Sequence, residues 1–208
     1  MSYIVQGTAE WLSARAGRLT ASRCADAFAR LKKGGWAGSR AQLLRELLAE
    51  RLTGDSVRHY VSPEMQWGID QEPNAKAEYE EETGQILRPA WLFDHPTIEN
   101  FAATPDALLG ADTVVEFKCP KTSTHILYCG LTTVPDEYQP QVLAQLACTR
   151  RTKAKLISYD PRIKGPKRMH VIDWEPDPAE IAAIEAEARE FLAELETMFE
   201  QFTSSEPV

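Results

Sequence analysis

The sequence contains no long apolar run, and no segment approaches the roughly 20 consecutive apolar residues that a helix needs to span a bilayer. Its first residues, Met1 to Gln6, lack both the basic region and the apolar core of a signal peptide. Cysteine is scarce, and its four copies have neither Cys-x-x-Cys spacing nor the density of a disulfide framework. These absences argue against a membrane protein and against a disulfide-stapled secreted domain, so we expect a cytoplasmic protein.

A net basic charge is missing as well. The chain carries 31 acidic and 23 basic residues, which gives a formal net charge of −8. This argues against a protein that coats nucleic acid by bulk electrostatics, for which a basic domain is expected. The negative net charge does not exclude a local cluster of basic residues on an otherwise acidic surface. The candidates for such a cluster lie at Lys32 and Lys33, at 150–155 and at 162–168.

The rest of the composition is that of an ordinary globular domain, with 43% apolar and 26% charged residues. Neither repeats nor a linker divide the chain, so we expect one domain over residues 1–208 with a disordered tail after about 202. Caps at Ser39, Ser62 and Asp177, apolar periodicity and β-branched runs predict the elements. Helices are expected at 22–31, 39–54, 62–84, 135–149 and 177–202, and strands at 85–93, 100–104, 107–109, 113–118, 154–159 and 168–174. This order predicts an α/β (α+β) fold, a mixed central β-sheet flanked by helices.

An acidic-basic cluster around the expected strand 113–118 is the most informative feature. Side chains alternate along a strand, so Glu116 and Lys118 point the same way, roughly 7 Å apart. A hairpin with the preceding strand brings Asp106 against them. Partly buried charges must be paired or must hold a metal, and this set suits a divalent cation that activates water. The alternative is that Glu116 and Lys118 are only the polar face of an edge strand.

Several motifs in the same order resemble the lambda-type phage recombination exonucleases, which are alkaline exonucleases of the PD-(D/E)xK nuclease superfamily. The likeness runs from about Glu10 to Phe202 and implies a restriction-endonuclease-like core. The matching segments are 11–15 with 19–22, Trp67-Gly68 with Glu72, Thr104-Pro105-Asp106, Glu116-Phe117-Lys118-Cys119-Pro120, Tyr138 with Gln141-Val142, and Tyr159-Asp160-Pro161-Arg162. One departure is Ala107, where the family motif commonly has glycine after the aspartate; it changes no ligand.

The resemblance implies a metal site. Glu72, Asp106 and Glu116 are its expected carboxylate ligands, with the main-chain carbonyl of Phe117 as a fourth. Such hard oxygen donors suit Mg²⁺, with Mn²⁺ as a substitute, rather than zinc. Two ions about 3.5–4 Å apart would stabilise the attacking and leaving oxygens. Lys118 would orient or deprotonate the attacking water, with a lowered pKa beside the cations.

The resemblance also implies further site residues. Gln141 is expected beside the catalytic lysine; its plain alternative is an ordinary surface glutamine. Arg15, Thr20 and Ser22 would hold the 5′-phosphate of the digested strand, because a guanidinium and hydroxyls bind phosphate well. Thr20 or Ser22 capping a helix is the alternative. Met65 would wedge between the DNA strands, unless it is a core methionine.

The function implied is a Mg²⁺-dependent 5′-to-3′ exonuclease on double-stranded DNA ends. It would processively digest one strand to mononucleotides and leave 3′ single-stranded overhangs for homologous recombination. A homotrimeric ring around the DNA and a phage single-strand annealing protein are the partners implied, in the cytoplasm of a bacterial host. Two alternatives stay open: a structure-specific endonuclease of the same superfamily, and a non-catalytic adaptor that binds DNA ends.

Overall fold

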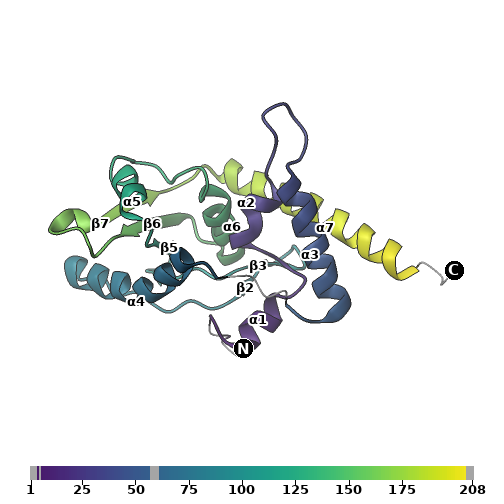
Figure 1. Cartoon of the computed structure of the whole chain (residues 1–208), viewed down its shortest axis with the longest axis horizontal. Helices are drawn as coiled ribbons and strands as arrows, with labels where there is room; N and C mark the ends of the chain where they lie inside the picture. Colours follow the sequence, from purple (N-terminus) through teal and green to yellow (C-terminus); the bar gives the residue numbers. More distant parts are fainter. Residues whose placement is uncertain (1–3, 5, 57–60, 205–208) are drawn as a thin grey trace.

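The computed structural model describes residues 4, 6–56 and 61–204, and Figure 1 shows the arrangement of its elements. The helices are α1 (Ala9–Arg15), α2 (Cys24–Ala27), α3 (Gly38–Thr53), α4 (Pro63–Thr83), α5 (Thr122–Tyr128), α6 (Gln139–Thr149) and α7 (Pro178–Ser204). The strands are β1 (Leu19–Thr20), β2 (Phe93–Asp94), β3 (Phe101–Ala103), β4 (Ala107–Leu109), β5 (Thr113–Lys118), β6 (Lys153–Tyr159) and β7 (Met169–Trp174). Two short 3₁₀ turns complete the order, η1 (Ala21–Arg23) and η2 (Pro166–Arg168).

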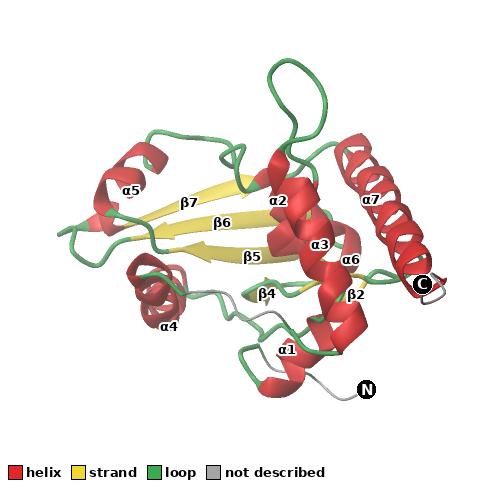
Figure 2. Ribbon diagram, turned by 45° about the vertical axis from the view of Figure 1, so that its right-hand side comes forward, coloured by secondary structure: helices red, strands yellow, loops and turns green. Residues whose placement is uncertain are grey.

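A mixed sheet lies at the centre of the fold, in the strand order β4-β5-β6-β7 (Figure 2). β4 and β5 form an antiparallel hairpin, β5 and β6 run parallel, and β6 and β7 are antiparallel. The parallel step is bridged by α5 and α6, since a parallel pair needs a long crossover. A second, small sheet has the order β1-β3-β2. The mixed α/β architecture predicted from the sequence is therefore confirmed.

Helices cover both faces of the central sheet. On one face Ala75 and Tyr79 of α4 pack with Val115 and Phe117 of β5. On the other face, residues of α6 join Val114 in a separate apolar cluster. The alternation along β5 therefore turns Glu116, which has the parity of Val114, toward α6.

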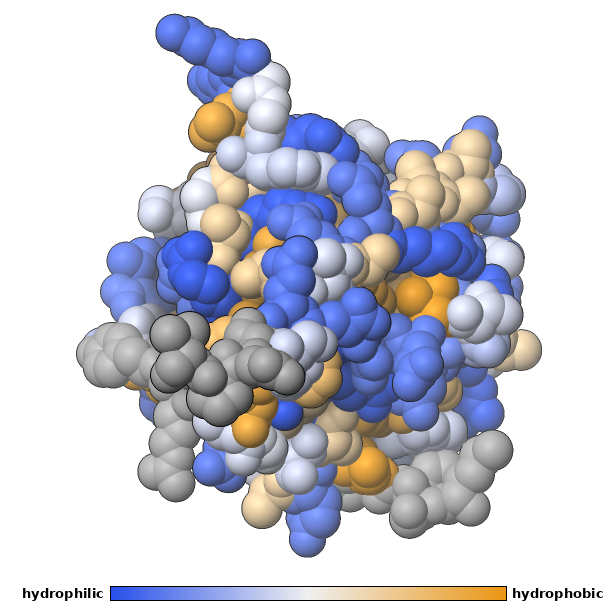
Figure 3. All heavy atoms as spheres, turned by 90° about the vertical axis from the view of Figure 1, so that its right-hand side faces the viewer, coloured by the Kyte–Doolittle hydropathy of each residue, from blue (hydrophilic) through white to orange (hydrophobic). Residues whose placement is uncertain are grey.

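A further layer of helices lies behind α6. The side of α6 away from the sheet contributes Leu143 and Ala147 to a large core with α3 and α7, which includes Leu43 and Phe191. The face of the molecule that carries α3 and α7 is mostly hydrophilic, with apolar side chains scattered over it (Figure 3). Among the described residues, no helix is both long enough and apolar enough to cross a membrane.

Several predicted boundaries are confirmed. α4 begins after Ser62, whose Oγ accepts a hydrogen bond from the Met65 amide, and ends at Gly84 with positive φ. β4 and β5 have the predicted limits. α7 opens with the predicted capping box, in which Asp177 and Glu180 each accept a backbone N–H.

Other expectations are wrong. The strand predicted at 85–93 is reduced to β2 and one bridge between Arg88 and Leu108, because Pro89 has no N–H to continue a ladder. Ser39 does not cap α3: the helix begins at Gly38, and the Ser39 hydroxyl lies 3.4 Å from the carbonyl of Asp26. The 3₁₀ turn η1 and the short helix α2, which ends at Ala27, replace the helix predicted at 22–31.

The segment between β5 and β6 and the C-terminal tail also differ from expectation. α6 begins at Gln139 rather than at 135, and α5 had not been predicted. The tail was expected to be disordered after 202, but it is still helical at Ser204, where α7 ends. The rest of that tail, 205–208, lies outside the described residues.

Candidate active site

The β4–β5 hairpin brings Asp106 to Glu116, as its register requires. Asp106 lies directly before β4, and Ala107 pairs with Val115. As a result the Asp106 Oδ2 atom accepts a hydrogen bond of 2.7 Å from the amide of Phe117. Two carboxylates and the ammonium of Lys118 therefore meet at one end of the central sheet.

Glu116 is almost fully buried, and both of its carboxylate oxygens are held. Its Oε1 atom accepts from Lys118 Nζ at 2.8 Å and from Gln141 Nε2 at 2.5 Å. Its Oε2 atom accepts from Gln145 Nε2 at 2.6 Å. Lys118 Nζ also donates to Gln141 Oε1 at 3.1 Å and lies 4.6 Å from the centroid of the Tyr138 ring. Gln141 is thus a neighbour of both Glu116 and Lys118, not an ordinary surface glutamine.

Gln145 was missed by the sequence reasoning. It lies one helical turn after Gln141 on α6, and residues four apart share one face of a helix. That spacing was the available signal: once Gln141 is assigned to the site, the polar residue four positions on is a candidate too.

The carboxylates carry more negative charge than the lysine can neutralise. Burial, and then the charges of Glu116 and Glu72, raise the pKa of Asp106 well above its usual value. Burial opposes the charge on Lys118, but Glu116 and Asp106 outweigh it and raise its pKa to about 12. The lowered pKa predicted for Lys118 concerned the lysine beside two cations; the protein groups alone shift it the other way. A bound divalent cation would relieve this repulsion.

Glu72 faces the same cavity from α4. This cavity, of about 420 Å³, is also lined by Asp106, Glu116 and Lys118. Glu72 Oε1 accepts from Lys76 Nζ at 2.6 Å, one turn further along the helix. Within the described part of the chain, no three acidic, histidine or cysteine side chains are already arranged as a metal site. Glu72 would therefore have to turn from Lys76 to join an ion held by the other two carboxylates.

The chemistry of the donors fits a hard divalent cation. Asp106, Glu116 and Glu72 offer carboxylate oxygens, which Mg²⁺ and Mn²⁺ prefer. Burial is the main cause of the raised pKa of Asp106, and the charges of Glu116 and Glu72 add to it; a divalent cation would relieve only this second contribution. The residues present thus suit Mg²⁺, although their side chains must rearrange to bind it.

Arg15, Thr20 and Ser22 come together next to the carboxylates. Arg15 Nη2 donates to Thr20 Oγ1 at 3.1 Å and to Ser22 Oγ at 3.0 Å, and its guanidinium lies 3.9 Å from the centroid of the Trp11 ring. Burial, and then the charge of Arg23, lower the pKa of Arg15 to about 10, so it is still charged at neutral pH. Thr20 makes no side-chain cap of the turn that follows it, and the N-cap of α2 is Arg23 rather than Ser22, so the alternative that one of the two hydroxyls caps a helix is wrong.

A small cavity of about 90 Å³ joins this arginine cluster to the acidic one. Its lining includes Arg15, Thr20 and Ser22 on one side and Asp106, Glu116 and Gln141 on the other. A phosphate bound by Arg15 would therefore lie immediately beside the carboxylates.

Met65 is an exposed residue of α4, not a core methionine. It is 53% exposed and lines the same 420 Å³ cavity as Glu72. Ile69, one turn later, is 57% exposed and lines that cavity too. α4 therefore presents two apolar side chains at the mouth of the acidic site.

Asp160 and Arg162 tie the segment after Lys118 to α4. The Asp160 side chain is fully buried and accepts from Arg162 Nε at 2.7 Å, Arg162 Nη2 at 3.0 Å and Thr122 Oγ1 at 2.6 Å. Arg162 Nη2 also donates to the carbonyl of Pro120 at 3.1 Å, and its guanidinium lies 4.5 Å from the Trp67 ring centroid. This unit fixes the backbone that follows the acidic strand.

We expect Asp160→Asn to destabilise the protein by about 1–2 kcal/mol at pH 7. Burial alone would raise the pKa of Asp160, but the hydrogen bonds from Arg162 and Thr122 outweigh it and lower the pKa from 3.8 to about 2. A full shift of this size is worth about 2.4 kcal/mol, discounted here because Arg162 is half exposed. A lowered pKa stabilises the fold above the unfolded value and ceases to do so as pH falls through the folded one. Urea unfolding should therefore show a constant difference from wild type between pH 8 and 5 that shrinks below about pH 4; a difference that grows in acid would contradict the assignment.

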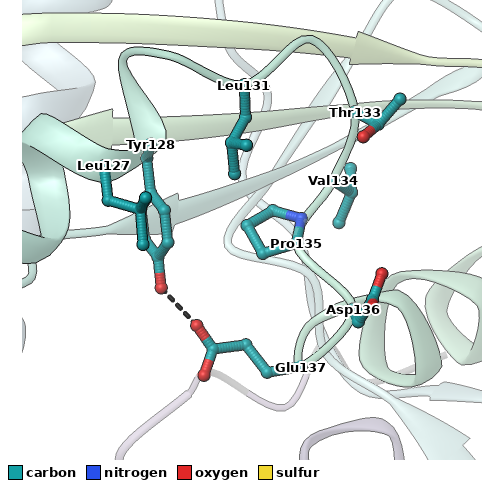
Figure 4. Close-up of a pocket in the computed structure, with 8 residues that line it drawn as sticks. All are labelled: Leu127, Tyr128, Leu131, Thr133, Val134, Pro135, Asp136 and Glu137. Carbon is teal, nitrogen blue, oxygen red and sulfur yellow. Dashed lines mark hydrogen bonds between the residues drawn. The ribbon is translucent and has the colours of Figure 1, made fainter.

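A separate pocket, of about 380 Å³, lies between α5 and the loop that precedes α6 (Figure 4). Tyr128 and Glu137 point toward each other across it, and the tyrosine hydroxyl donates to the carboxylate. It shares no lining residue with the acidic cavity.

Comparisons with known proteins give the family of the chain and the solved structures that share its fold. A family model described as "YqaJ-like viral recombinase domain" matches residues 10–152. Two crystal structures are similar to this chain at 41% sequence identity: LHK-Exo, an alkaline exonuclease from Laribacter hongkongensis, and LHK-Exo in complex with dAMP. Each match covers 95% of this chain and 97% of the other, with a TM-score of 0.87. A phage related exonuclease from Haemophilus somnus 129PT is similar in fold, with a TM-score of 0.65 over 87% of this chain and 96% of the other, at 14% identity. A search of curated proteins gives no match.

Proposed function

Because this chain belongs to the family of YqaJ-like viral recombinase domains, we propose that it is a 5′-to-3′ exonuclease that resects double-stranded DNA ends for recombination. The 41% identity to LHK-Exo, an alkaline exonuclease, extends over 95% of this chain and supports nuclease activity. The 5′-to-3′ polarity, Mg²⁺ dependence and processive digestion to mononucleotides are the finer parts of the proposal.

The observation that carries the proposal is the small cavity between Arg15 and the acidic cluster. A guanidinium flanked by two hydroxyls is suited to a phosphate dianion. A terminal 5′-phosphate bound there would place the next phosphodiester beside Asp106 and Glu116. An enzyme that cuts within a strand has no need of such a pocket, so its position favours removal of nucleotides from a 5′ end.

The expected chemistry is hydrolysis of a phosphodiester. Asp106, Glu116 and Glu72 would hold Mg²⁺, which polarises the phosphate and makes water a stronger nucleophile. Lys118 Nζ, held by Glu116 and Gln141, would orient the attacking water or take its proton. The water oxygen bonds to phosphorus, and the bond between phosphorus and the 3′-oxygen breaks. That oxygen takes up a proton and becomes the 3′-hydroxyl of the released 5′-mononucleotide, while the remaining strand carries the new 5′-phosphate.

The remaining parts of the proposal concern the DNA and its partners. Met65, exposed at the mouth of the cavity, would separate the digested strand from its complement. The complement would remain as a 3′ overhang for a phage single-strand annealing protein. A homotrimeric ring around the DNA, in the cytoplasm of a bacterial host, would give processivity without a basic surface overall.

Digestion of end-labelled linear duplex tests the proposal, with wild type compared to Arg15→Gln. We expect wild type with Mg²⁺ to release 5′-labelled mononucleotides first, to prefer 5′-phosphorylated ends, and to leave closed circular DNA intact. Charge-assisted hydrogen bonds contribute about 1.5–3 kcal/mol, so Arg15→Gln should lose about 10- to 100-fold of that preference. Arg189→Gln on α7, which removes an exposed arginine that pairs with Glu185, is the matched control.

The other outcomes decide between the alternatives. Internal fragments, or cutting of closed circles, would indicate a structure-specific endonuclease. Binding of DNA ends without any cleavage would indicate an adaptor. Early release of the 3′ label would show that the polarity is wrong.

A further inference from the structure

Gln145 is a fully buried polar residue whose position the core does not explain. Its neighbours on α6, Ala144 and Leu146, are buried apolar residues of the core. Its Nε2 atom donates to Glu116 Oε2 at 2.6 Å, whereas its Oε1 atom is buried and has no hydrogen-bond partner among the described residues. Buried polar side-chain atoms without a partner are uncommon in proteins, and each calls for an explanation.

The orientation of the Gln145 amide follows from chemistry. An ionised carboxylate can only accept hydrogen bonds, so the atom that meets Glu116 must be the amide nitrogen. Flipping the amide would place its oxygen against the Glu116 carboxylate, where two acceptors would face each other without a proton between them. The contact with Glu116 is therefore kept at the expense of the oxygen, which is left unpaired.

Gln141 and Gln145 each donate a hydrogen bond to a different oxygen of the Glu116 carboxylate. Gln141 holds Oε1 together with Lys118 and lines the small cavity, where DNA would bind. Gln145 holds Oε2 from within the core, one turn deeper on the same helix. The two amides fix the rotation of the carboxylate, and only Gln145 does so from a place that substrate does not reach.

We propose that Gln145 is a positioning residue that presets the carboxylate of Glu116 for a divalent cation. The inference rests on the proposed function, because it assigns Gln145 to the same metal site. A ligand held in its binding orientation loses little freedom when the ion arrives. Groups that orient metal ligands in this way typically change metal affinity by about 10- to 100-fold when removed.

The test compares Gln145→Met with Leu146→Met. Both place methionine at a buried position of α6, but only the first removes the donor to Glu116. We expect Gln145→Met to weaken Mn²⁺ binding to the DNA-free protein about 10- to 100-fold, measured by titration calorimetry or by the electron paramagnetic resonance of free Mn²⁺. The Mg²⁺ concentration for half-maximal nuclease activity should rise by the same factor, while kcat at saturating Mg²⁺ stays within about threefold of wild type. Leu146→Met should change neither.

Gln145→Asn gives an independent check should the methionine variant fold poorly. It keeps an amide but is one methylene shorter, so it adds no volume and breaks the contact. Folding of each variant is verified by its thermal midpoint without ions. Mn²⁺ affinity within threefold of wild type in a folded variant would overturn the inference, as would an equal loss in Leu146→Met or a fall in kcat with unchanged affinity. If wild type itself neither binds Mn²⁺ nor cuts DNA, the proposed function has failed instead.

Discussion

Asp106→Asn is expected to abolish nuclease activity and, at the same time, to make the protein more stable. Loss of a metal ligand removes several kcal/mol of transition-state stabilisation, which corresponds to a fall in kcat of about 10³-fold or more. The stability should rise because burial and the charges of Glu116 and Glu72 oppose an ionised Asp106. Asparagine keeps an oxygen for the Phe117 amide but carries no charge.

Thermal unfolding with and without Mg²⁺ measures this second effect. Each kcal/mol gained should raise the midpoint by about 2–4 °C in a chain of this size. Mg²⁺ should raise the midpoint of wild type, since a ligand that binds only the folded state stabilises it, and should have little effect on Asp106→Asn. Such a loss of the Mg²⁺ response would separate a ligand role from a merely structural one.

Asp112→Asn is the matched control. Asp112 lies in the turn of the same hairpin, half exposed, and pairs with Lys153 at 3.0 Å. The same substitution there should leave both kcat and the Mg²⁺ response unchanged. An Asp106→Asn protein that remained active, or that became less stable than wild type at neutral pH, would contradict the reading of the acidic cluster.

The acidic hairpin could be predicted from the sequence because its geometry is local. Strand alternation places Glu116 and Lys118 on one face, and a short turn fixes the register that brings back Asp106. No long-range information is needed for this part of the site. The same is true of α4, because its N-cap Ser62 and its C-cap Gly84 can both be recognised in the sequence.

The partners of that hairpin could not be derived in the same way. Gln141 entered only through a family resemblance, and Gln145 was missed, because helix α6 reaches Glu116 through the packing of the whole domain. The strand predicted at 85–93 failed for a related reason: Ile86 and Leu87 favour a strand, but Ile86 is 79% exposed and none of the described strands pairs with it. Strand propensity reflects the fit to a partner more than a preference of the residue itself.

Glu72 shows a third kind of limit. The sequence places it on α4 and the fold brings it to the acidic cavity, yet Lys76 one turn away holds its carboxylate. A local pair at this spacing is easily formed and is worth only about 0.2–0.5 kcal/mol on a helix. A divalent cation would readily outcompete it, so the pairing is compatible with a ligand role that appears only when the ion binds.

Lys118→Met is expected to lower kcat by about 10²- to 10⁴-fold, the usual contribution of a group that moves a proton in the transition state. Metal affinity should not fall with it. Lys118 Nζ occupies Glu116 Oε1, so the lysine competes with a cation for the same carboxylate. Removing it should leave Mn²⁺ binding unchanged or tighter, whereas loss of a ligand would weaken it. Lys155→Met, which removes a lysine paired with Asp173 on the next strand, is the control and should leave kcat unchanged.

Lys118→Arg then separates the two roles open to the lysine. Arginine keeps the positive charge beside Glu116 but cannot give up its proton in a protein. Without the lysine the buried Glu116 carboxylate keeps its two glutamine donors but loses its opposite charge, which costs about 3 kcal/mol or more. Lys118→Met should therefore unfold at a lower temperature in the absence of Mg²⁺, and Lys118→Arg should recover much of that loss. Burial opposes the charge on Lys118, but Glu116 and Asp106 outweigh it and raise its pKa to about 12, so the lysine is protonated at neutral pH. Cations bound to those carboxylates would lower that pKa. If Lys118 takes the proton of the attacking water, Lys118→Arg stays as inactive as Lys118→Met despite its recovered stability, and the wild-type rate rises with pH until the lysine is deprotonated. If Lys118→Arg instead returns to within tenfold of wild type, the lysine acts through its charge alone, by orienting the water.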